Sequence, residues 1–340
     1  MTKSATAEPR QPLTSLTPAD YYSAAAFERE CAQRLRRSWV PVCRAEDLAE
    51  AGAQKAVVLA GSPLLITRDR GGQLFALSNV CRHRAMTLVE GDARGEVIRC
   101  PYHLWSYGLD GALAAAPFMD RDAVAGCDLP RYAVAEWGGW VFVDLGGAAA
   151  PLAPLLAPLE ADLKPARLAT FRAGFRISLQ HAWNWKVLVE NFGESYHHIG
   201  AHTQTLQPIW PGGQTDATPS TAAWIDIRHP VHPTAGELRV LVVFPLLLLA
   251  LTPADDGVVW YRLNPTGPEQ IELEIVGLYP PEIAADAGRM AQAEAGVMAV
   301  HREDIVVCDR VQAGLRSPDA VLGPLSKLED GIARFREWIG

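Results

Sequence analysis

Two short stretches of the chain each hold one cysteine and one histidine. Cys81 and His83 follow the spacing C-x-H, and Cys100 and His103, which come after sixteen intervening residues, follow C-x2-H. Two thiolates and two imidazoles suit a [2Fe–2S] centre in which histidines replace the cysteines of one iron. That replacement raises the reduction potential. The pattern therefore predicts a small metal-binding domain that accepts and passes on single electrons.

Zinc is the alternative metal for these four side chains, because cysteine and histidine also bind zinc tetrahedrally. C-x-H is an uncommon first half for a zinc site, so we favour the iron–sulfur interpretation. The other four cysteines are scattered along the chain, and we expect them to pack rather than to form disulfides. They are Cys31, Cys43, Cys127 and Cys308.

The charge and hydropathy of the chain exclude several classes of partner. The 340 residues carry a net charge of −8, which disfavours binding to nucleic acid or to an anionic membrane. The longest apolar run, residues 240–251, is too short to span a bilayer and contains Pro245, so we expect a buried strand there. The first residues are polar and show no secretory signal, so we expect a cytoplasmic protein.

Strand-like and helical patterns predict an α+β fold with antiparallel sheets. After residue 39, short strand-like runs alternate with Gly, Pro and Asp turns, which is typical of a small antiparallel β domain. In the second half, strand-like segments are flanked by helices rather than alternating with them. The expected helices are 18–37, 182–198, 284–315 and 325–338.

These patterns divide the chain into three parts. We expect an N-terminal segment and helix at 1–38, a β domain with the Cys/His ligands at 39–147, and a second domain at 148–340. No G-x-G-x-x-G motif follows a predicted strand, so we do not expect a nucleotide site.

A second group of ligand-type residues lies in the second domain. Glu194, His197 and His202 form the pattern E-x2-H-x4-H. Glu194 and His197 share a face if the segment is helical, whereas His198 points off that face. Gly200 offers a break at which the chain can turn and bring His202 beside His197. Two histidines and a carboxylate form the set that holds Fe(II) with positions left open for dioxygen.

Two carboxylates compete for the third position on that iron, Glu194 and Asp304. A carboxylate on an inward-facing helical stripe costs several kcal/mol unless it is paired or binds metal, so Asp304 is the better third ligand. Glu194 is then left for another role. Glu303 falls on the flank of the same helix. The stripe consists of Val297, His301, Asp304, Cys308, Val311 and Leu315.

These residues resemble the Rieske-type non-heme iron ring-hydroxylating oxygenases, in their alpha (oxygenase) subunits. Segments 81–84 and 100–105 resemble the Rieske signature of that family. Segments 184–186 and 190–202 resemble its iron-site signature, and segment 303–315 resembles the late helix that carries the iron carboxylate. The similarity extends over about residues 18–338, with the two domains in the family's order.

The resemblance implies a Rieske β domain followed by a helix-grip catalytic domain, which is an antiparallel sheet with a long C-terminal helix. It implies that His197, His202 and Asp304 hold the mononuclear iron. It also implies a ring-shaped homotrimer, in which His103 of one chain approaches Glu194 of the next and an electron crosses there toward His197.

Two positions depart from the family's usual pattern. Ala85 stands where Gly is common, so a left-handed backbone there would be mildly strained. Glu194 stands where Asp is the commoner bridging residue. Glutamate at that position resembles the members that oxidise quaternary ammonium compounds such as carnitine.

The function implied by the resemblance is that of a terminal oxygenase component. A separate reductase, with or without a ferredoxin, would deliver electrons from NADH or NADPH for the activation of O2. We expect hydroxylation or oxidative demethylation of a small organic substrate. Cis-dihydroxylation of an aromatic ring is the alternative reaction. A Rieske electron carrier with a non-catalytic second domain is the alternative of another class.

The walls of the substrate pocket are expected to come from the apolar run near residue 245. Four aromatic residues are candidates for a cage around an alkylammonium group, although core packing is their commoner role. The expected wall residues are Phe244, Leu246, Leu248 and Leu251, and the aromatic candidates are Trp210, Trp224, Trp260 and Tyr261.

Overall fold

The structure is a computed structural model that describes residues 16–218, 224–252 and 257–340. It forms two compact units: Cys31–Phe171, and Arg172–Gly340 together with the described residues up to Glu30. All strand pairs between the named strands are antiparallel, which confirms the expected α+β class. The boundaries at 38 and 147 differ from those of the compact units, and the division into functional domains stays a prediction.

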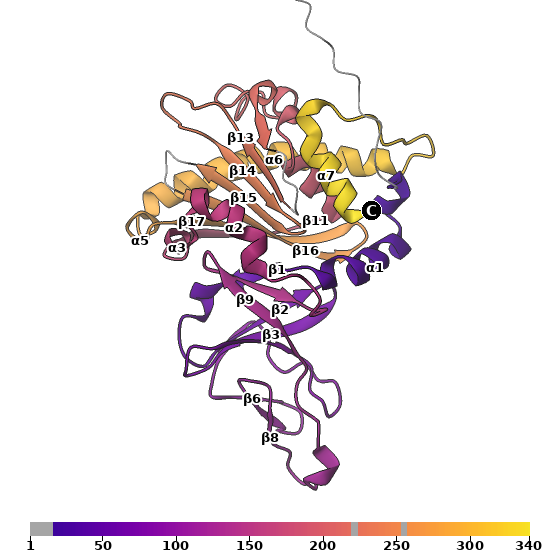
Figure 1. The fold of residues 1–340 in the computed structure, drawn as a ribbon, viewed down its shortest axis with the longest axis vertical. Helices are drawn as coiled ribbons and strands as arrows, with labels where there is room; N and C mark the ends of the chain where they lie inside the picture. Colours follow the sequence, from indigo (N-terminus) through magenta and orange to yellow (C-terminus); the bar gives the residue numbers. More distant parts are fainter. Residues whose placement is uncertain (1–15, 219–223, 253–256) are drawn as a thin grey trace, which may run out of the picture. The chain divides into compact units, whose positions relative to one another are not determined.

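The unit Cys31–Phe171 is built on a seven-stranded sheet with the order β1-β10-β9-β4-β3-β2-β5 (Figure 1). Its central strands are apolar, and the side chains of Leu64, Leu65 and Ile66 are completely buried. The strands are β1 (Val40–Arg44), β2 (Ala53–Leu59), β3 (Ser62–Arg68), β4 (Leu74–Ser78), β5 (Asp92–Arg94), β9 (Arg131–Trp137) and β10 (Trp140–Asp144). Helices α2 (Leu152–Leu163) and α3 (Pro165–Leu168) end this unit.

A small three-stranded sheet in the same unit carries the Cys/His segments. It consists of β6 (Val97–Arg99), β7 (Ser106–Gly108) and β8 (Leu113–Ala115). Ile98 and Tyr107 from this sheet are fully buried in an apolar cluster with Leu65 and Leu77 of the larger sheet. This cluster fixes the ends of the strands from which the Cys/His loops emerge.

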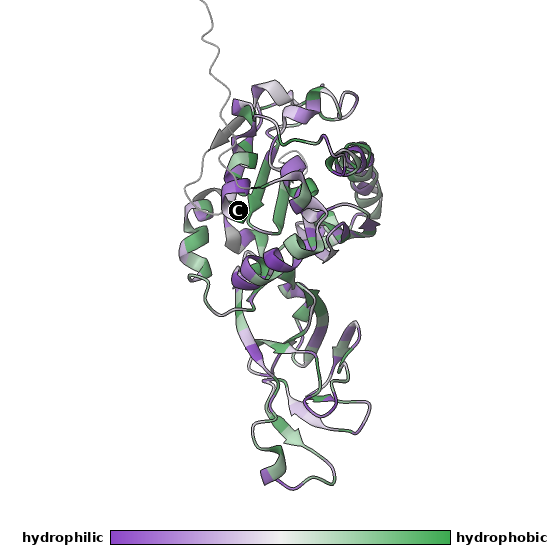
Figure 2. Cartoon of the chain, turned by 90° about the vertical axis from the view of Figure 1, so that its right-hand side faces the viewer, coloured by the Kyte–Doolittle hydropathy of each residue, from purple (hydrophilic) through white to green (hydrophobic). Residues whose placement is uncertain are grey.

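The second unit is built on another seven-stranded sheet, with the order β11-β17-β16-β15-β14-β13-β12. Its central strands are strongly hydrophobic (Figure 2), and helix α6 (Ala287–Leu315) lies along one face of the sheet (Figure 1). The strands are β11 (Arg172–His181), β12 (Asp216–Thr218), β13 (Trp224–Arg228), β14 (Arg239–Val243), β15 (Leu247–Thr252), β16 (Gly257–Gly267) and β17 (Gln270–Tyr279).

The apolar run expected to form one strand is instead a hairpin. Strands β14 and β15 pair with each other, with Val240 opposite Ala250 and Val242 opposite Leu248. Pro245 lies in the turn between them, where its missing N–H interrupts no ladder. The single-strand prediction was therefore wrong. The register of the hairpin decides which side chains of this run share a face.

The N-terminal helix predicted for residues 18–37 is divided into three pieces. The Nζ of Lys186 donates to the Asp20 carbonyl at 2.9 Å. In a continuous helix this oxygen would instead accept from the backbone N–H four residues further on. The pieces are the 3₁₀ turn Pro18–Tyr21, α1 (Ala24–Gln33) and the 3₁₀ turn Leu35–Arg37.

The other predicted helices are shorter than expected, because capping groups set their ends. Asp286 accepts hydrogen bonds from the N–H groups of Gly288 and Arg289 and so begins α6, while a separate short helix, α5 (Pro281–Ala284), precedes it. Helix α4 is Trp185–Phe192 and α7 is Asp330–Ile339. None of the helices in the described ranges is both long and apolar enough to cross a bilayer.

A buried ion pair holds α4 against α1. The Nζ of Lys186 donates to both carboxylate oxygens of Glu30 at 2.7 and 2.9 Å, and both side chains are almost fully buried. The indole of Trp185 adds a hydrogen bond to Glu30 at 3.1 Å. Since α4 directly precedes Glu194 and His197, this pair anchors the backbone that leads to them.

Replacing Lys186 with methionine is expected to destabilise the chain by about 3–5 kcal/mol, because the Glu30 carboxylate then stays buried without its cation. The midpoint of urea unfolding measures the loss. The double variant Glu30→Leu/Lys186→Met should recover most of it, since no charge remains buried. Lys327→Met, at an exposed position, is the control and should unfold like the parent. An unchanged midpoint in Lys186→Met would show that the pair does not stabilise the fold.

Candidate functional site

The two Cys/His segments adopt matching loops. In each, the cysteine N–H donates to the carbonyl five residues on at 2.8 Å, and the cysteine carbonyl accepts from the N–H four residues on at 3.1 Å. Each loop closes with a left-handed residue, Ala85 at φ 56° and Leu104 at φ 61°. Neither is glycine, so both loops carry a small backbone strain. The loops present Cys81 and Cys100 in equivalent ways.

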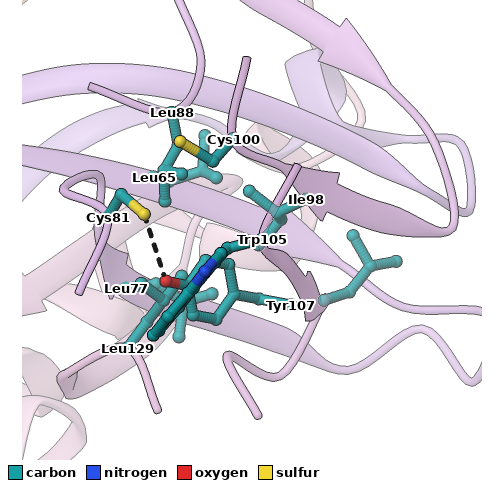
Figure 3. Packing of buried hydrophobic residues seen from close by; sticks show 10 residues of the cluster. Leu65, Leu77, Cys81, Leu88, Ile98, Cys100, Trp105, Tyr107 and Leu129 are labelled. Carbon is teal, nitrogen blue, oxygen red and sulfur yellow. Dashed lines mark hydrogen bonds between the residues drawn. The ribbon is translucent and has the colours of Figure 1, made fainter. Parts of the chain in front are cut away.

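The four predicted cluster ligands converge from these loops. Cys81 and Cys100 are buried, at 3% and 2% exposure, within the apolar cluster shown in Figure 3. The rings of His83 and His103 lie on the outer side with their centroids 4.7 Å apart. The site therefore has a buried thiol half and a more exposed imidazole half.

The surroundings of these four residues fit a [2Fe–2S] centre. The Nδ1 of His103 is buried without a hydrogen-bond partner among the described residues, as expected for an atom that ligates metal. The ring of His83 is stacked on Trp105 at 4.8 Å, which holds its orientation. The hydroxyl of Tyr107 lies 3.3 Å from the Cys81 sulfur (Figure 3), so it can donate to a ligating thiolate.

His197, His202 and Asp304 meet in the second unit. One potential ligand atom from each lies within 4.8 Å of the other two. Oδ1 of Asp304 is 3.0 Å from Nε2 of His202 and 3.7 Å from Nε2 of His197. Two imidazoles and one carboxylate on one side of a space fit Fe(II) with open positions. The carboxylate in this group is Asp304, the one that the sequence analysis preferred over Glu194.

Glu194 contacts His197, although not through a shared helical face as predicted. Helix α4 ends at Phe192, and His197 lies on a separate 3₁₀ turn, Tyr196–Ile199. One oxygen of Glu194 accepts from the His197 backbone N–H at 3.0 Å, and the other lies 2.7 Å from its Nδ1. Glu194 is thus the residue that holds the His197 ring, with Nε2 left toward the ligand cluster.

His198 is not part of the group formed by His197, His202 and Asp304. Its Nδ1 bonds the Trp210 carbonyl at 2.9 Å, and its ring is stacked on His229 with centroids 5.2 Å apart. Burial lowers the pKa of His198 to about 3. The side chain is therefore neutral and committed to packing beside the site.

The predicted inward stripe of α6 is wrong at Val311 and correct at Leu315, which is buried. Val311 is 44% exposed, while Gln312 is buried and accepts from the Asn184 N–H at 2.8 Å. A seven-residue repeat does not match the 3.6-residue helical turn, so position 312 rather than 311 faces inward at this level of the helix.

Glu303 was not predicted as a site residue, because its helical position put it on the flank of the stripe. Its Oε2 lies 2.7 Å from Nδ1 of His202 and accepts from the Thr205 hydroxyl. Burial acts against protonation of His202, yet Asp304 and Glu303 together raise its pKa. A metal-binding histidine usually donates its other ring N–H to a carboxylate, and that general need was the available signal.

Glu303→Gln is expected to weaken iron binding by about 10- to 100-fold, because the amide holds the His202 ring less firmly than the carboxylate does. The measurement is equilibrium binding of Fe(II) to the iron-free chain under anaerobic conditions. Glu294→Gln, at an exposed position of the same helix, should bind like the parent. Equal affinity of the Glu303 variant and the parent would contradict the positioning role.

A cavity of about 430 Å³ opens beside His197, His202 and Asp304. The expected wall residues Phe244, Leu246, Leu248 and Leu251 are not among its described lining, because the hairpin register turns other side chains toward it. Trp210 and Tyr261 line it, whereas Trp224 and Trp260 do not. Its apolar lining includes Phe192, Leu206, Leu238, Val240, Ala250, Val259, Ala293, Val297 and Val300.

Each half of the chain matches a family model derived from known proteins. Residues 38–135 match the family model of the Rieske [2Fe-2S] domain. Residues 168–239 and 226–340 match that of the ring hydroxylating alpha subunit (catalytic domain), which together cover more than half of the chain.

Several relatives and solved structures with similar sequence or fold are named as oxygenases or hydroxylases. The glycine betaine monooxygenase oxygenase subunit of Chromohalobacter salexigens is 31% identical over 66% of this chain, which spans about half (51%) of that relative. Putrescine 2-hydroxylase of Ralstonia nicotianae is 25% identical, with 96% of this chain and 94% of that protein covered. The crystal structure of the quaternary ammonium Rieske monooxygenase CntA with L-carnitine shares the fold, at TM-score 0.83 and 24% identity over 97% of this chain and 96% of that one. The chain therefore belongs to the ring-hydroxylating alpha-subunit family, with a Rieske [2Fe-2S] domain ahead of the catalytic domain.

Proposed function

We propose that this chain is the terminal oxygenase component of a Rieske oxygenase system that hydroxylates or oxidatively demethylates a small organic substrate. The observation that carries the proposal is the convergence of His197, His202 and Asp304 at a cavity whose remaining walls are largely apolar. An electron carrier has no need for such a cavity beside open ligand positions. A substrate that must meet activated dioxygen does need it.

The proposed ligands are Cys81, Cys100, His83 and His103 for the cluster, and His197, His202 and Asp304 for the iron. When bound, the two centres supply single electrons and a site at which dioxygen is reduced.

Around these centres, the residues of the chain hold protons and orient rings. Glu194 accepts the Nδ1 proton of His197, and Glu303 accepts that of His202, so both imidazoles present Nε2. Tyr107 directs its hydroxyl at the sulfur of Cys81. The apolar walls of the cavity exclude water from the reacting group of the substrate.

The proposal includes partners. A separate reductase, with or without a ferredoxin, supplies electrons from NADH or NADPH. The functional assembly is a homotrimer in which the imidazole of His103 in one chain approaches Glu194 of its neighbour. Glu194 supports this arrangement because its carboxylate already contacts the ring of His197, so a residue that reaches Glu194 is coupled to the iron site.

Two features of the cavity bear on the reaction. Trp210, Tyr261 and Phe192 supply aromatic faces that suit an alkylammonium group, in agreement with the glycine betaine activity named for one relative. The apolar walls Leu238, Val240 and Val259 instead suit a hydrocarbon ring, and they favour cis-dihydroxylation as the second candidate reaction.

A substrate screen with a surrogate reductase tests the proposal. N-methylated amines, betaines and simple arenes are supplied to the iron-loaded chain, and oxygen uptake and formaldehyde are recorded. Substrate-dependent oxygen uptake with formaldehyde supports demethylation, and a cis-diol without formaldehyde supports ring attack. A chain that holds about two iron atoms, takes up no oxygen and still passes electrons would be the carrier instead.

A further inference from the structure

The cavity beside the iron site has a second polar end. Besides His197, His202 and Asp304, its lining includes two polar residues from the first turns of α6, Arg289 and Gln292. Between them and Asp304, the same helix contributes Ala293, Val297 and Val300. The cavity is therefore apolar in its middle and polar at both ends.

The two ends are far apart. Arg289 and Asp304 are fifteen residues apart on one continuous helix, which corresponds to about 22 Å along its axis. The cavity also reaches Tyr279, at the end of β17, beyond Val259 and Tyr261 of β16. A molecule that touches both ends must be elongated, much longer than the trimethylammonium group of a betaine.

The charges at the two ends are opposite. The acidic residues among the described cavity lining, Glu194 and Asp304, both belong to the iron site. Arg289 lies at the other end, and among the described residues no carboxylate forms an ion pair with its guanidinium. Asp286, the nearest acid in sequence toward the start of α6, is occupied in capping two backbone N–H groups. The far end thus offers an uncompensated cation.

We propose that Arg289 binds the carboxylate of an elongated substrate whose apolar body fills the cavity and whose reacting carbon lies at the iron site. This inference rests on the proposed oxygenase function and names its substrate class. A guanidinium matches a carboxylate with two parallel hydrogen bonds, and Gln292 can add an amide donor on the same helix. Arg289 is exposed, so the carboxylate would stay near solvent while the apolar chain lies in the cavity.

Direct binding tests the inference without turnover. Dodecanoate, dodecan-1-ol and dodecylamine share the same apolar chain and differ in their head group, and their affinities for the iron-loaded chain are measured by calorimetry. We expect dodecanoate to bind at least about 10-fold more tightly than dodecylamine. Arg289→Gln should weaken dodecanoate binding by about 10- to 100-fold and leave dodecan-1-ol unchanged, with partial recovery in Arg289→Lys. Arg302→Gln, at an exposed position of the same helix outside the cavity lining, is the matched control.

A steric variant tests the path between the two ends. Gly296 lines the cavity between Arg289 and Asp304, and a Cβ atom there would meet no heavy atom within 4 Å beyond the nearby backbone of its own helix. Gly296→Leu should therefore fill the middle of the cavity and weaken dodecanoate and dodecan-1-ol alike, by about 10-fold or more. Circular dichroism confirms that the variants fold.

Three results would overturn the inference. The first is dodecylamine binding to the parent chain as tightly as dodecanoate does. The second is Arg289→Gln binding dodecanoate as tightly as the parent. The third is Arg302→Gln losing as much affinity for dodecanoate as Arg289→Gln. A fourth result, the absence of binding of all three probes, also overturns it. The proposed oxygenase function has its own readout, since substrate-dependent oxygen uptake by the parent chain is measured separately from the binding of these probes.

Discussion

Replacing Glu194 with glutamine is expected to stop turnover while both metal centres stay loaded. Glu194 is outside the ligand cluster, yet its carboxylate lies 2.7 Å from Nδ1 of His197. Glutamine keeps the shape and can still accept the backbone N–H of His197, but it lacks the charge that polarises the imidazole. Loss of a carboxylate in this position costs up to about 100-fold in activity, and the proposed bridging role adds to that loss.

The experiment separates loading from electron delivery. Iron content and the visible spectrum of the cluster report loading, and oxygen uptake with saturating substrate reports turnover. With a chemically reduced cluster, the variant should stay reduced after oxygen and substrate are added, whereas the parent is reoxidised. Glu282→Gln, an exposed position on α5, is the control. Near-normal oxygen uptake by Glu194→Gln would contradict the bridge, and loss of one iron would show that Glu194 acts on iron binding through the His197 ring.

Asp304→Ala is expected to remove the mononuclear iron and leave the cluster intact. Iron should fall from about three to about two atoms per chain, because His197 and His202 alone hold Fe(II) weakly. Oxygen uptake should disappear with that iron. Removing the carboxylate also leaves His202 with Glu303 as its remaining acidic neighbour, so the fold around the ring persists.

Iron analysis reports whether the mononuclear iron is lost, and the spectrum of the reduced chain reports whether the [2Fe–2S] cluster is intact. Asp309→Asn, an exposed carboxylate on the same helix, should keep about three iron atoms and normal turnover. Retention of the mononuclear iron in Asp304→Ala would assign the third position to another carboxylate. Loss of the cluster signal together with the iron would show that the substitution acts through the fold.

Much of the site could be predicted because its spacing is local. Cys81 with His83, and Cys100 with His103, each lie on one short loop, so C-x-H and C-x2-H spacing constrains where the side chains can go. His202 reaches His197 for the same reason, across a five-residue step. Asp304 is more than one hundred residues away, and helical periodicity together with the cost of burying a carboxylate selected it.

Other features were decided by contacts between distant segments. The break in the predicted helix 18–37 depends on Lys186, whose amine takes up the Asp20 carbonyl. The hairpin around Pro245 depends on pairing with a neighbouring strand, and its register alone selects Val240 and Ala250 for the cavity. Side-chain patterns do not contain this information, because an apolar run is equally compatible with one strand or two.

The sequence by itself was enough to predict which residues would hold the two centres and to determine the α+β class, since both depend on residue chemistry and local pattern. The tertiary structure decided which carboxylate supports each histidine, Glu194 for His197 and Glu303 for His202. It also decided that the cavity runs along α6 from Asp304 to Arg289. The physical reason is that a hydrogen bond across one hundred residues, or a cavity between a helix and a sheet, exists only once the chain has folded.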